Sequence, residues 1–258
     1  GGSPAAFLGC LLLVEAGALA TFTARDAVLF FVAFELVLVP MWVLISRYGD
    51  RHDLAARVDA GHRFVLYTAV GSTLMLVGIL ALVTSAGTSS LPDLATGAGP
   101  APSADRLLPV AGLLVAGLAV KVPVFPLHTW LPPAHTTAPT AGSVLLAAVL
   151  LKMGTYGLVR LPVASVPDGF ARLAPVLAVL GVVGILWGGL VCLVERDLKR
   201  LIAYSSVAHM GFVVLALAAG SETGLQAALF ANIAHGVISA LLFFLVGGYS
   251  NGVSWAAS

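Results

Sequence analysis

The sequence predicts an all-α membrane protein, a polytopic bundle of about eight membrane-spanning helices in which one helix is discontinuous. Three observations support this prediction. Of the 258 residues, 59% are apolar and only 10% are charged, whereas soluble domains carry about 25% charged residues. The apolar residues fall into runs of roughly 20, the length that crosses a bilayer. Prolines interrupt one of these runs beside a lysine. We expect residues 1–258 to form a single membrane domain.

Eight apolar runs have the length of a membrane span. In chain order they are residues 6–22, 27–46, 64–86, a run that begins at Leu107 and becomes irregular after Lys121, and 141–159, 173–194, 201–221 and 225–248. Two connections are long, 47–63 and 87–106, and the second is rich in Gly, Pro, Ser and Thr, which predicts a flexible loop. Lys and Arg gather in 47–63 and in the connection after residue 194. We therefore expect both connections on the cytoplasmic side of a multi-pass protein of the cell inner (plasma) membrane.

Composition and motifs exclude several classes of protein. The net charge is +1, so the sequence indicates no basic face for nucleic acid. The two cysteines, Cys10 and Cys192, are far apart and lie in apolar runs, which predicts neither a disulfide framework nor a cysteine metal site. The sequence holds no P-loop, no GxSxG nucleophile and no dinucleotide fingerprint. We therefore expect this chain to bind no cofactor and no metal. Its apolar composition predicts contact with the lipid bilayer.

Four charged residues lie inside the predicted spans: Glu15, Glu35, Lys121 and Lys152. A charge at the centre of a membrane helix costs about 2.5–3.5 kcal/mol on insertion scales, and proteins accept it mainly in proton relays, ion pathways and counter-ions. Glu35 and Lys152 are too central to reach the interface by snorkelling, so we expect both to be functional. The sequence around Glu15 suggests no partner for it.

Prolines predict where the discontinuous helix breaks. Pro123 and Pro126 follow Lys121 and remove hydrogen-bond donors, so the helix should end near Lys121, deep in the membrane. Broken backbone at that depth is tolerated only inside protein or beside a wet cavity, and transporters place ion sites at such breaks. The polar segment 128–140 then fits a second half-helix packed inside the protein. Pro40 predicts another interruption, in the second span.

Histidines mark the second half of the chain. Two polar stripes consist of Ser205, Ser206 and His209 on one helix and of Asn232, His235 and Ser239 on the next. Because residues three and four apart share a helix face, each stripe offers the file of polar groups that proton transfer through water needs. The alternative is ordinary hydrogen bonding between helices, worth only about 0.6 kcal/mol for each bond. His128 and His135 lack the further ligands that a metal site requires.

Several long motifs resemble one family of membrane proteins. The run Lys-Val-Pro-Val-Phe-Pro-Leu-His-Thr-Trp-Leu-Pro at 121–132 resembles the broken helix of the proton-translocating antiporter-like family. The segments 34–41, 138–157, 197–211 and 235–247 are also typical of that family, in the form found in bacterial NADH:quinone oxidoreductase, complex I. The motifs occur in the family's order and cover nearly the whole chain.

The resemblance implies a fold and a set of site residues. The family fold has fourteen helices with two inverted repeats, and the eight predicted spans match its fourth to eleventh helices, so we expect this chain to be a fragment. Glu35 resembles the family's buried glutamate and Lys121 its lysine partner at the helix break. Lys152 resembles the central lysine of the channel, and His209 and His235 resemble the histidines of the connecting polar axis.

The resemblance also implies a function. Such a subunit of the membrane arm translocates protons, coupled to electron transfer from NADH to quinone in other subunits. NADH, FMN, the iron–sulfur clusters and quinone are then bound by those subunits, and the partners of this chain are other membrane subunits of complex I, including adjacent antiporter-like subunits. The nearest rival hypothesis is a subunit of a multisubunit sodium/proton antiporter or of a membrane-bound hydrogenase complex. A structural subunit whose charges only lock helices together is a second rival, and a solitary solute carrier is a third.

Overall fold

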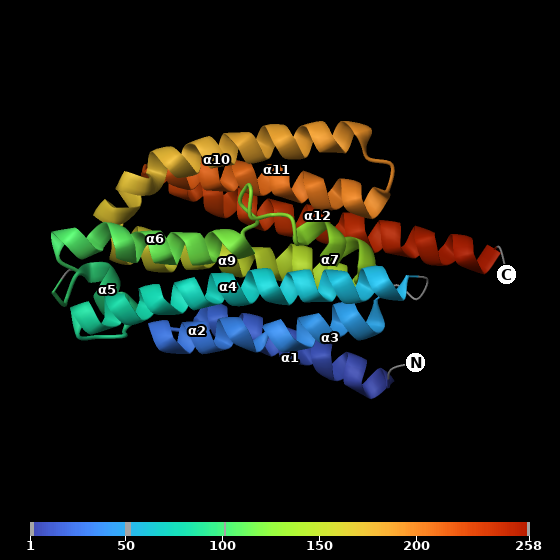
Figure 1. Ribbon diagram of the computed structural model, residues 1–258, viewed down its shortest axis with the longest axis horizontal. Helices are drawn as coiled ribbons and strands as arrows, with labels where there is room; N and C mark the ends of the chain where they lie inside the picture. Colours follow the sequence, from blue (N-terminus) through green and yellow to red (C-terminus); the bar gives the residue numbers. More distant parts are fainter. Residues whose placement is uncertain (1–2, 50–52, 101, 257–258) are drawn as a thin grey trace.

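The computed structural model describes residues 3–49, 53–100 and 102–256 of the chain, and the regular elements of these ranges form a bundle of helices. In chain order they are α1 (Pro4–Thr23), α2 (Ala27–Leu36), α3 (Leu38–Tyr48), α4 (Leu54–Ala86), α5 (Leu91–Thr96), α6 (Ala104–Lys121), α7 (Leu131–Thr137), α8 (Thr140–Leu145), η1 (Leu146–Leu150), α9 (Leu151–Leu158), η2 (Val159–Val163), α10 (Pro167–Val194), α11 (Leu198–Ala218) and α12 (Glu222–Ala256), where η marks a π-helical stretch. The long helices lie roughly along one axis, and the N- and C-terminal ends lie at the same end of the bundle (Figure 1). The predicted all-α fold is confirmed.

The predicted spans are present, including the discontinuous one. Within the described ranges, seven helical stretches are long and apolar enough to cross a membrane. The remaining predicted span consists of α6, which ends at Lys121, a series of turns, and the short α7. α2 and α3 together form one span that is interrupted at Val37. Pro40 explains this interruption, because it has no N–H to donate to the carbonyl of Leu36.

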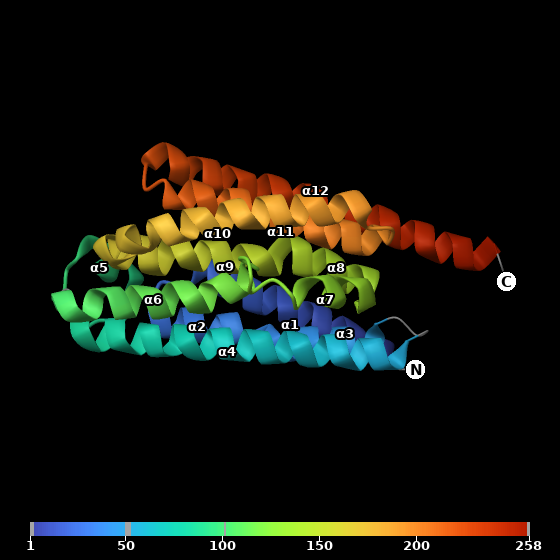
Figure 2. The same cartoon turned by 45° about the horizontal axis from the view of Figure 1, so that its top comes forward.

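The helices form three tiers, which Figure 2 shows one above another. α1–α4 make up one outer tier, α6–α9 the middle tier, and α10–α12 the other outer tier. The middle tier holds the most buried span, since 61% of the apolar window of Thr140–Val163 is buried, against 22% of that of Pro167–Val194. Because Lys121 and Lys152 both belong to the middle tier, both charges lie inside the bundle rather than against lipid.

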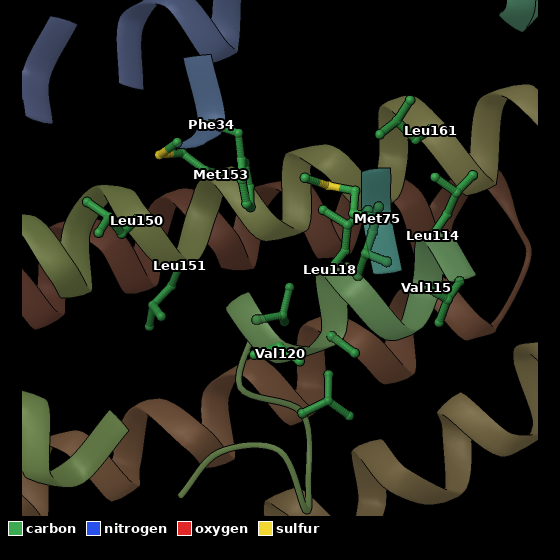
Figure 3. Packing of buried hydrophobic residues seen from close by; sticks show 14 of the residues in the cluster. Phe34, Met75, Leu114, Val115, Leu118, Val120, Leu150, Leu151, Met153 and Leu161 are labelled. Carbon is green, nitrogen blue, oxygen red and sulfur yellow. The ribbon is translucent and has the colours of Figure 1, made fainter. Parts of the chain in front are cut away.

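Apolar side chains, some of which Figure 3 shows, and closely approaching glycines bring the first and middle tiers together. Met75 of α4 packs with Leu114 and Leu118 of α6 in the main buried cluster. The backbones of the same two helices approach closely at Gly117, where a Cβ atom would lie 2.7 Å from the backbone nitrogen of Met75 and 2.8 Å from its Cβ. Membrane helices associate through such close packing at small residues, because lipid supplies no hydrophobic drive between them.

The third predicted span begins earlier than its apolar run. α4 starts at Leu54 rather than at residue 64, so most of the preceding connection is helical, contrary to prediction. The Asp53 side chain caps the helix by accepting a hydrogen bond from a backbone N–H of the first turn (2.8 Å). Arg63 and Asp59 then form an ion pair one turn apart (2.7 Å) on the helix surface. Caps and i,i+4 ion pairs extend a helix beyond its apolar stretch. A span predicted from apolar residues alone therefore starts too late.

The connection 87–106 contains structure that its composition does not predict. It includes the helix α5, and its residue Ser90 forms a β-bridge with Asp26. Asp26 caps α2 by accepting hydrogen bonds from the N–H groups of Val28 (2.8 Å) and Leu29 (2.9 Å), and it also accepts one from the hydroxyl of Ser89. The Ser89 hydrogen bond and those backbone N–H groups lower the pKa of Asp26 from its ordinary value. These contacts join the connection between α1 and α2 to the connection after α4 at one end of the bundle.

Candidate functional site

Lys121 lies at the end of the first half of the discontinuous helix. α6 ends there, and the chain passes through turns before α7 begins. Two carbonyls freed by the break find other donors: the N–H of Val124 donates to Ala119 (3.0 Å) and the indole of Trp130 donates to Val120 (2.9 Å). The side chain of Lys121 is 3% exposed. The C-terminal end of a helix carries partial negative charge, which favours a cation at this position.

Aromatic rings surround the ammonium group of Lys121. Its Nζ lies 4.9 Å from the ring centroid of Phe34 on α2 and 5.8 Å from that of Phe64 on α4. Distances below about 6 Å are those of cation–π contacts. Within the described ranges, Lys121 makes no ion pair with a carboxylate. The ammonium is therefore held by the faces of two rings.

Glu35 lies near Lys121 but points to another partner. Its Oε1 accepts a hydrogen bond from the hydroxyl of Ser72 on α4. The carboxylate forms no ion pair with Lys121, although the preceding residue, Phe34, contacts the lysine's ammonium. The structure thus places Glu35 and Lys121 in one region of the bundle, but each side chain contacts a different partner.

Lys152 lies in a separate polar cluster on α9 and is 6% exposed. Its Nζ donates a hydrogen bond to the carbonyl of Ala147 (2.6 Å), which belongs to the π-helical stretch η1. The same Nζ lies 2.5 Å from Nδ1 of His235 on α12. π-Helical turns inside α-helices occur frequently at functional sites. The arrangement fixes the lysine between its own helix and a histidine of a neighbouring one.

His235 continues a line of hydrogen bonds away from Lys152. Its Nε2 lies 3.0 Å from the hydroxyl oxygen of Ser206 on α11, and that hydroxyl in turn donates to the carbonyl of Ile202 (3.1 Å). A neutral imidazole has one donor and one acceptor nitrogen. Since the Lys152 ammonium only donates, the consistent assignment makes Nδ1 the acceptor and Nε2–H the donor. This line, Lys152–His235–Ser206, joins three helices, and Lys152, His235 and Ser206 are all buried.

His209 lies next to this line rather than within it. Its ring centroid is 5.3 Å from that of His235, with the planes tilted by 41°. Its Nδ1 bonds the carbonyl of Ser205 (2.7 Å), and the residue is exposed. The structure therefore brings the two predicted histidines together, with His209 beside the middle residue of the hydrogen-bonded line.

An open groove of about 700 Å³ gives access to Lys152. It runs between α9 and α12, and Tyr156 and Asn232 also line it. Asn232 is 7% exposed, and its Oδ1 has no hydrogen-bond partner among the described residues. The predicted polar stripe of α12 is therefore real, because Asn232, His235 and Ser239 are all buried on one side of that helix.

α9 also passes close to Lys121. A Cβ atom on Gly154 would lie 3.1 Å from the Cβ of Lys121, and Gly154 is two positions from Lys152 in the chain. One short helix therefore contacts both polar clusters. The start of the Lys121 side chain therefore lies beside the helix that carries Lys152.

The sequence did not single out several residues of the site. Ser72 and Phe64 lie outside the family-like motifs, and Phe34 lies within one, but the sequence gives none of the three a role in holding Glu35 or Lys121. His135 is fully buried, stacks on Phe243 with ring centroids 4.3 Å apart, and has no hydrogen-bond partner on either ring nitrogen among the described residues.

Glu15 stands apart from both polar clusters. It is exposed on α1 and lines an apolar groove of about 570 Å³ beside α8 and α12. The predicted second half-helix, by contrast, is packed inside the protein as expected, because His135, Leu131 and Trp130 are each 0% exposed.

Comparisons with known proteins agree with this architecture. Residues 24–254 match the family model described as "NADH:quinone oxidoreductase/Mrp antiporter, TM". NAD(P)H-quinone oxidoreductase chain 4 3 of Trichormus variabilis is 45% identical over 244 residues, which cover 95% of this chain and 44% of that protein. A chain in the structure of respiratory complex I from Thermus thermophilus with bound NADH is 34% identical, with a TM-score of 0.88 over 95% of this chain and 51% of that one. A chain of the Mrp complex from Dietzia sp. DQ12-45-1b is 26% identical, with a TM-score of 0.81 over 92% of this chain and 44% of that one.

The fold and the buried charges define a multi-pass helical membrane protein with a polar interior. The match over residues 24–254 identifies the family more closely, and the chain belongs to the NADH:quinone oxidoreductase/Mrp antiporter transmembrane family. It spans about half the length of the relatives it matches.

Proposed function

We propose that this chain forms part of a proton-translocating membrane subunit of an NADH:quinone oxidoreductase in the plasma membrane. The observation that carries the proposal is the buried line Lys152–His235–Ser206, with its spacings of 2.5 Å and 3.0 Å. Its residues have the chemistry of a proton relay, and an intramembrane lysine otherwise costs several kcal/mol. The names of the relatives at 45% identity support the oxidoreductase assignment.

Proton transfer in this line follows from the two nitrogens of His235. A proton leaves the Lys152 ammonium for Nδ1 as the proton on Nε2 passes to the Ser206 hydroxyl, which releases its own proton in turn to a further acceptor, the role we assign to the neighbouring imidazole of His209. The lysine ends neutral, and the imidazole ends neutral in its other tautomer. A new proton must then reach Lys152, and we propose that it enters along the mostly apolar groove that Lys152, Tyr156 and Asn232 help to line. His209, beside His235, is the next group that can accept or donate a proton.

Glu35 and Lys121 act on this line through charge. When Glu35 approaches Lys121, the two charges compensate each other; when it moves away, the ammonium remains against the rings of Phe34 and Phe64 without a counter-charge in contact. Coulomb interactions are strong where the effective dielectric constant is low, so the two arrangements alter the field at Lys152. The energy for the cycle comes from quinone reduction elsewhere in the complex. NADH, FMN, iron–sulfur clusters and quinone belong to other subunits, and adjacent antiporter-like subunits are the expected neighbours.

A second candidate function is ion exchange in a multisubunit sodium/proton antiporter. The similarity of the fold to a chain of the Mrp complex, with a TM-score of 0.81, supports this second function. The higher sequence identity of the NAD(P)H-quinone oxidoreductase relatives favours the first proposal. The two differ in what drives transport, because only the oxidoreductase requires NADH.

The test is proton uptake by inverted membrane vesicles, followed with a pH-sensitive dye while NADH oxidation is recorded. Lys152→Ala in the full-length protein should abolish NADH-driven uptake while the complex remains assembled on a native gel. Thr155→Ala on the same helix is the matched control, because among the described residues its buried hydroxyl bonds only the carbonyl of Leu151. Full uptake in the Lys152 variant contradicts the relay. A sodium-dependent pH change without NADH supports the antiporter instead.

A further inference from the structure

We propose that Ser72 is a positioning residue that holds Glu35 away from Lys121 and so sets how readily their ion pair closes. This inference rests on the proposed function, since it concerns the same charge pair. It goes beyond the pair itself, because it assigns the control of the pair to a hydroxyl on a third helix.

The first observation is the direction of the Ser72 hydroxyl. Most hydroxyls of α4 donate to carbonyls of their own helix: Thr68 to Phe64, Thr73 to Ala69, Thr84 to Leu80 and Ser85 to Ala81. Such local bonding is the common behaviour of Ser and Thr within helices. Ser72 is buried, yet its hydroxyl crosses to α2 and donates to Oε1 of Glu35. The carboxylate thereby gains a donor that does not neutralise its charge.

The second observation is the surroundings of Lys121. With Glu35 bound to Ser72, the ammonium rests against Phe34 and Phe64, at 4.9 Å and 5.8 Å from their centroids. Cation–π contacts stabilise a cation without offering it a proton acceptor. Each member of the pair therefore has an alternative partner in the separated arrangement. Two discrete arrangements of this kind are what a switch requires.

The balance between the arrangements depends on the Ser72 hydroxyl. Hydrogen bonds to charged groups are stronger than those between neutral groups. Without that donor, Glu35 keeps one strong partner within its region, the ammonium of Lys121. The pair then stays closed, and the charge separation that changes the field at Lys152 becomes rare. We expect proton translocation to fall by on the order of tenfold when the hydroxyl is removed.

The test compares three variants of the full-length protein in the assembled complex. Ser72→Ala removes the donor and Ser72→Thr keeps it. Thr68→Ala removes a buried hydroxyl of the same helix, which within the described ranges donates to carbonyls of its own helix alone. Proton uptake per NADH oxidised is measured in inverted vesicles. We expect a loss in Ser72→Ala, recovery in Ser72→Thr and wild-type values in Thr68→Ala.

A double-mutant cycle with Glu35→Gln separates positioning from simple structural damage. If Ser72 acts through Glu35, then Ser72→Ala adds no further loss in the Glu35→Gln background. Equal losses in both backgrounds, or the same behaviour of Ser72→Ala and Thr68→Ala, overturn the inference. Failure of the proposed function is a different result, in which Lys152→Ala and Glu35→Gln themselves retain full uptake.

Discussion

Nζ of Lys152 and Nδ1 of His235 lie 2.5 Å apart, although 83 positions separate the two residues in the chain. Gly236 makes this approach possible, because a Cβ atom there would lie 3.3 Å from Cε of Lys152 and 3.2 Å from the carbonyl oxygen of Ala148. The glycine lets α12 approach α9, and the histidine before it reaches the lysine. A residue without a side chain at position 236 is therefore needed for the contact between Lys152 and His235.

Replacing His235 with glutamine should separate hydrogen bonding from proton transfer. Glutamine offers an acceptor to Lys152 and a donor to Ser206, but it cannot accept and release a proton as imidazole does. We expect His235→Gln to assemble normally and to lose NADH-driven proton uptake by roughly a hundredfold. Gln226→Ala on the exposed side of the same helix is the control. Uptake at the wild-type rate in His235→Gln would show that the histidine only joins helices.

Exchanging Glu35 and Lys121 tests whether their charges only lock helices together. A purely structural pair should tolerate Glu35→Lys combined with Lys121→Glu, because the attraction is symmetric. The surroundings are not symmetric: two ring faces and a helix C-terminus favour a cation at 121, and a hydroxyl donor favours an anion at 35. We expect the exchanged protein to lose proton uptake even when the complex assembles. Recovery of full uptake by the double exchange, after loss in each single variant, would favour the structural role.

The sequence predicts the spans and the charged positions well, because both follow from local rules. A run of about 20 apolar residues and a pair of prolines after Lys121 are visible without any tertiary contact. Lys152 and His235 are recognisable for the same reason, since each is a polar residue inside an apolar run. Their contact with one another is not, because it depends on how α12 packs against α9.

The hydrogen-bond partner of Glu35 is the feature of the site that the sequence predicts least well. Charge complementarity predicts that Glu35 pairs with Lys121, but in the structure its carboxylate accepts a hydrogen bond from Ser72. A serine on a helix can bond a carbonyl of its own helix or point elsewhere, so the choice depends on how α2 and α4 cross. The early start of α4 has a similar cause, since the cap at Asp53 is an interaction between a side chain and a neighbouring backbone N–H.

Asp26 should make the stability of the protein depend on pH. Its folded pKa is lowered, first by the hydrogen bond from Ser89. This stabilisation is therefore fully present above the ordinary pKa of an aspartate, about 4, and is lost as the pH falls through the lower folded value. Asp26→Ala should cost about 1 kcal/mol near neutral pH, as for other helix caps.

Thermal unfolding of the purified full-length protein in detergent measures this effect. Asp26→Asn is the control, because asparagine caps a helix nearly as well as aspartate and does not titrate. The advantage of the wild type over Asp26→Asn should be constant above about pH 5 and should shrink below about pH 4. An advantage that persists unchanged at about pH 3, well below the ordinary aspartate pKa, would assign the role of Asp26 to something other than its charge.

Two adjacent glycines of α10 provide a test of how the outer tier is packed. A Cβ atom on Gly188 would lie 2.8 Å from the carbonyl oxygen of Tyr204 and 2.9 Å from the backbone nitrogen of Ala208, both on α11. A Cβ atom on Gly189 would meet no atom of the described part of the chain within 4 Å. Since backbone atoms cannot move aside as a flexible side chain does, Gly188→Ala should force α10 and α11 apart.

The expected cost of Gly188→Ala is about 1–3 kcal/mol, the usual range for overpacking. Gly189→Ala should be neutral or stabilising by up to about 1 kcal/mol, because alanine is the better helix former. Both variants are compared by thermal unfolding in the same detergent. Equal effects of the two substitutions would mean that α10 does not approach α11 through Gly188. A selective loss at Gly188 would support close backbone contact, rather than side-chain interlocking, as what holds α10 on the bundle.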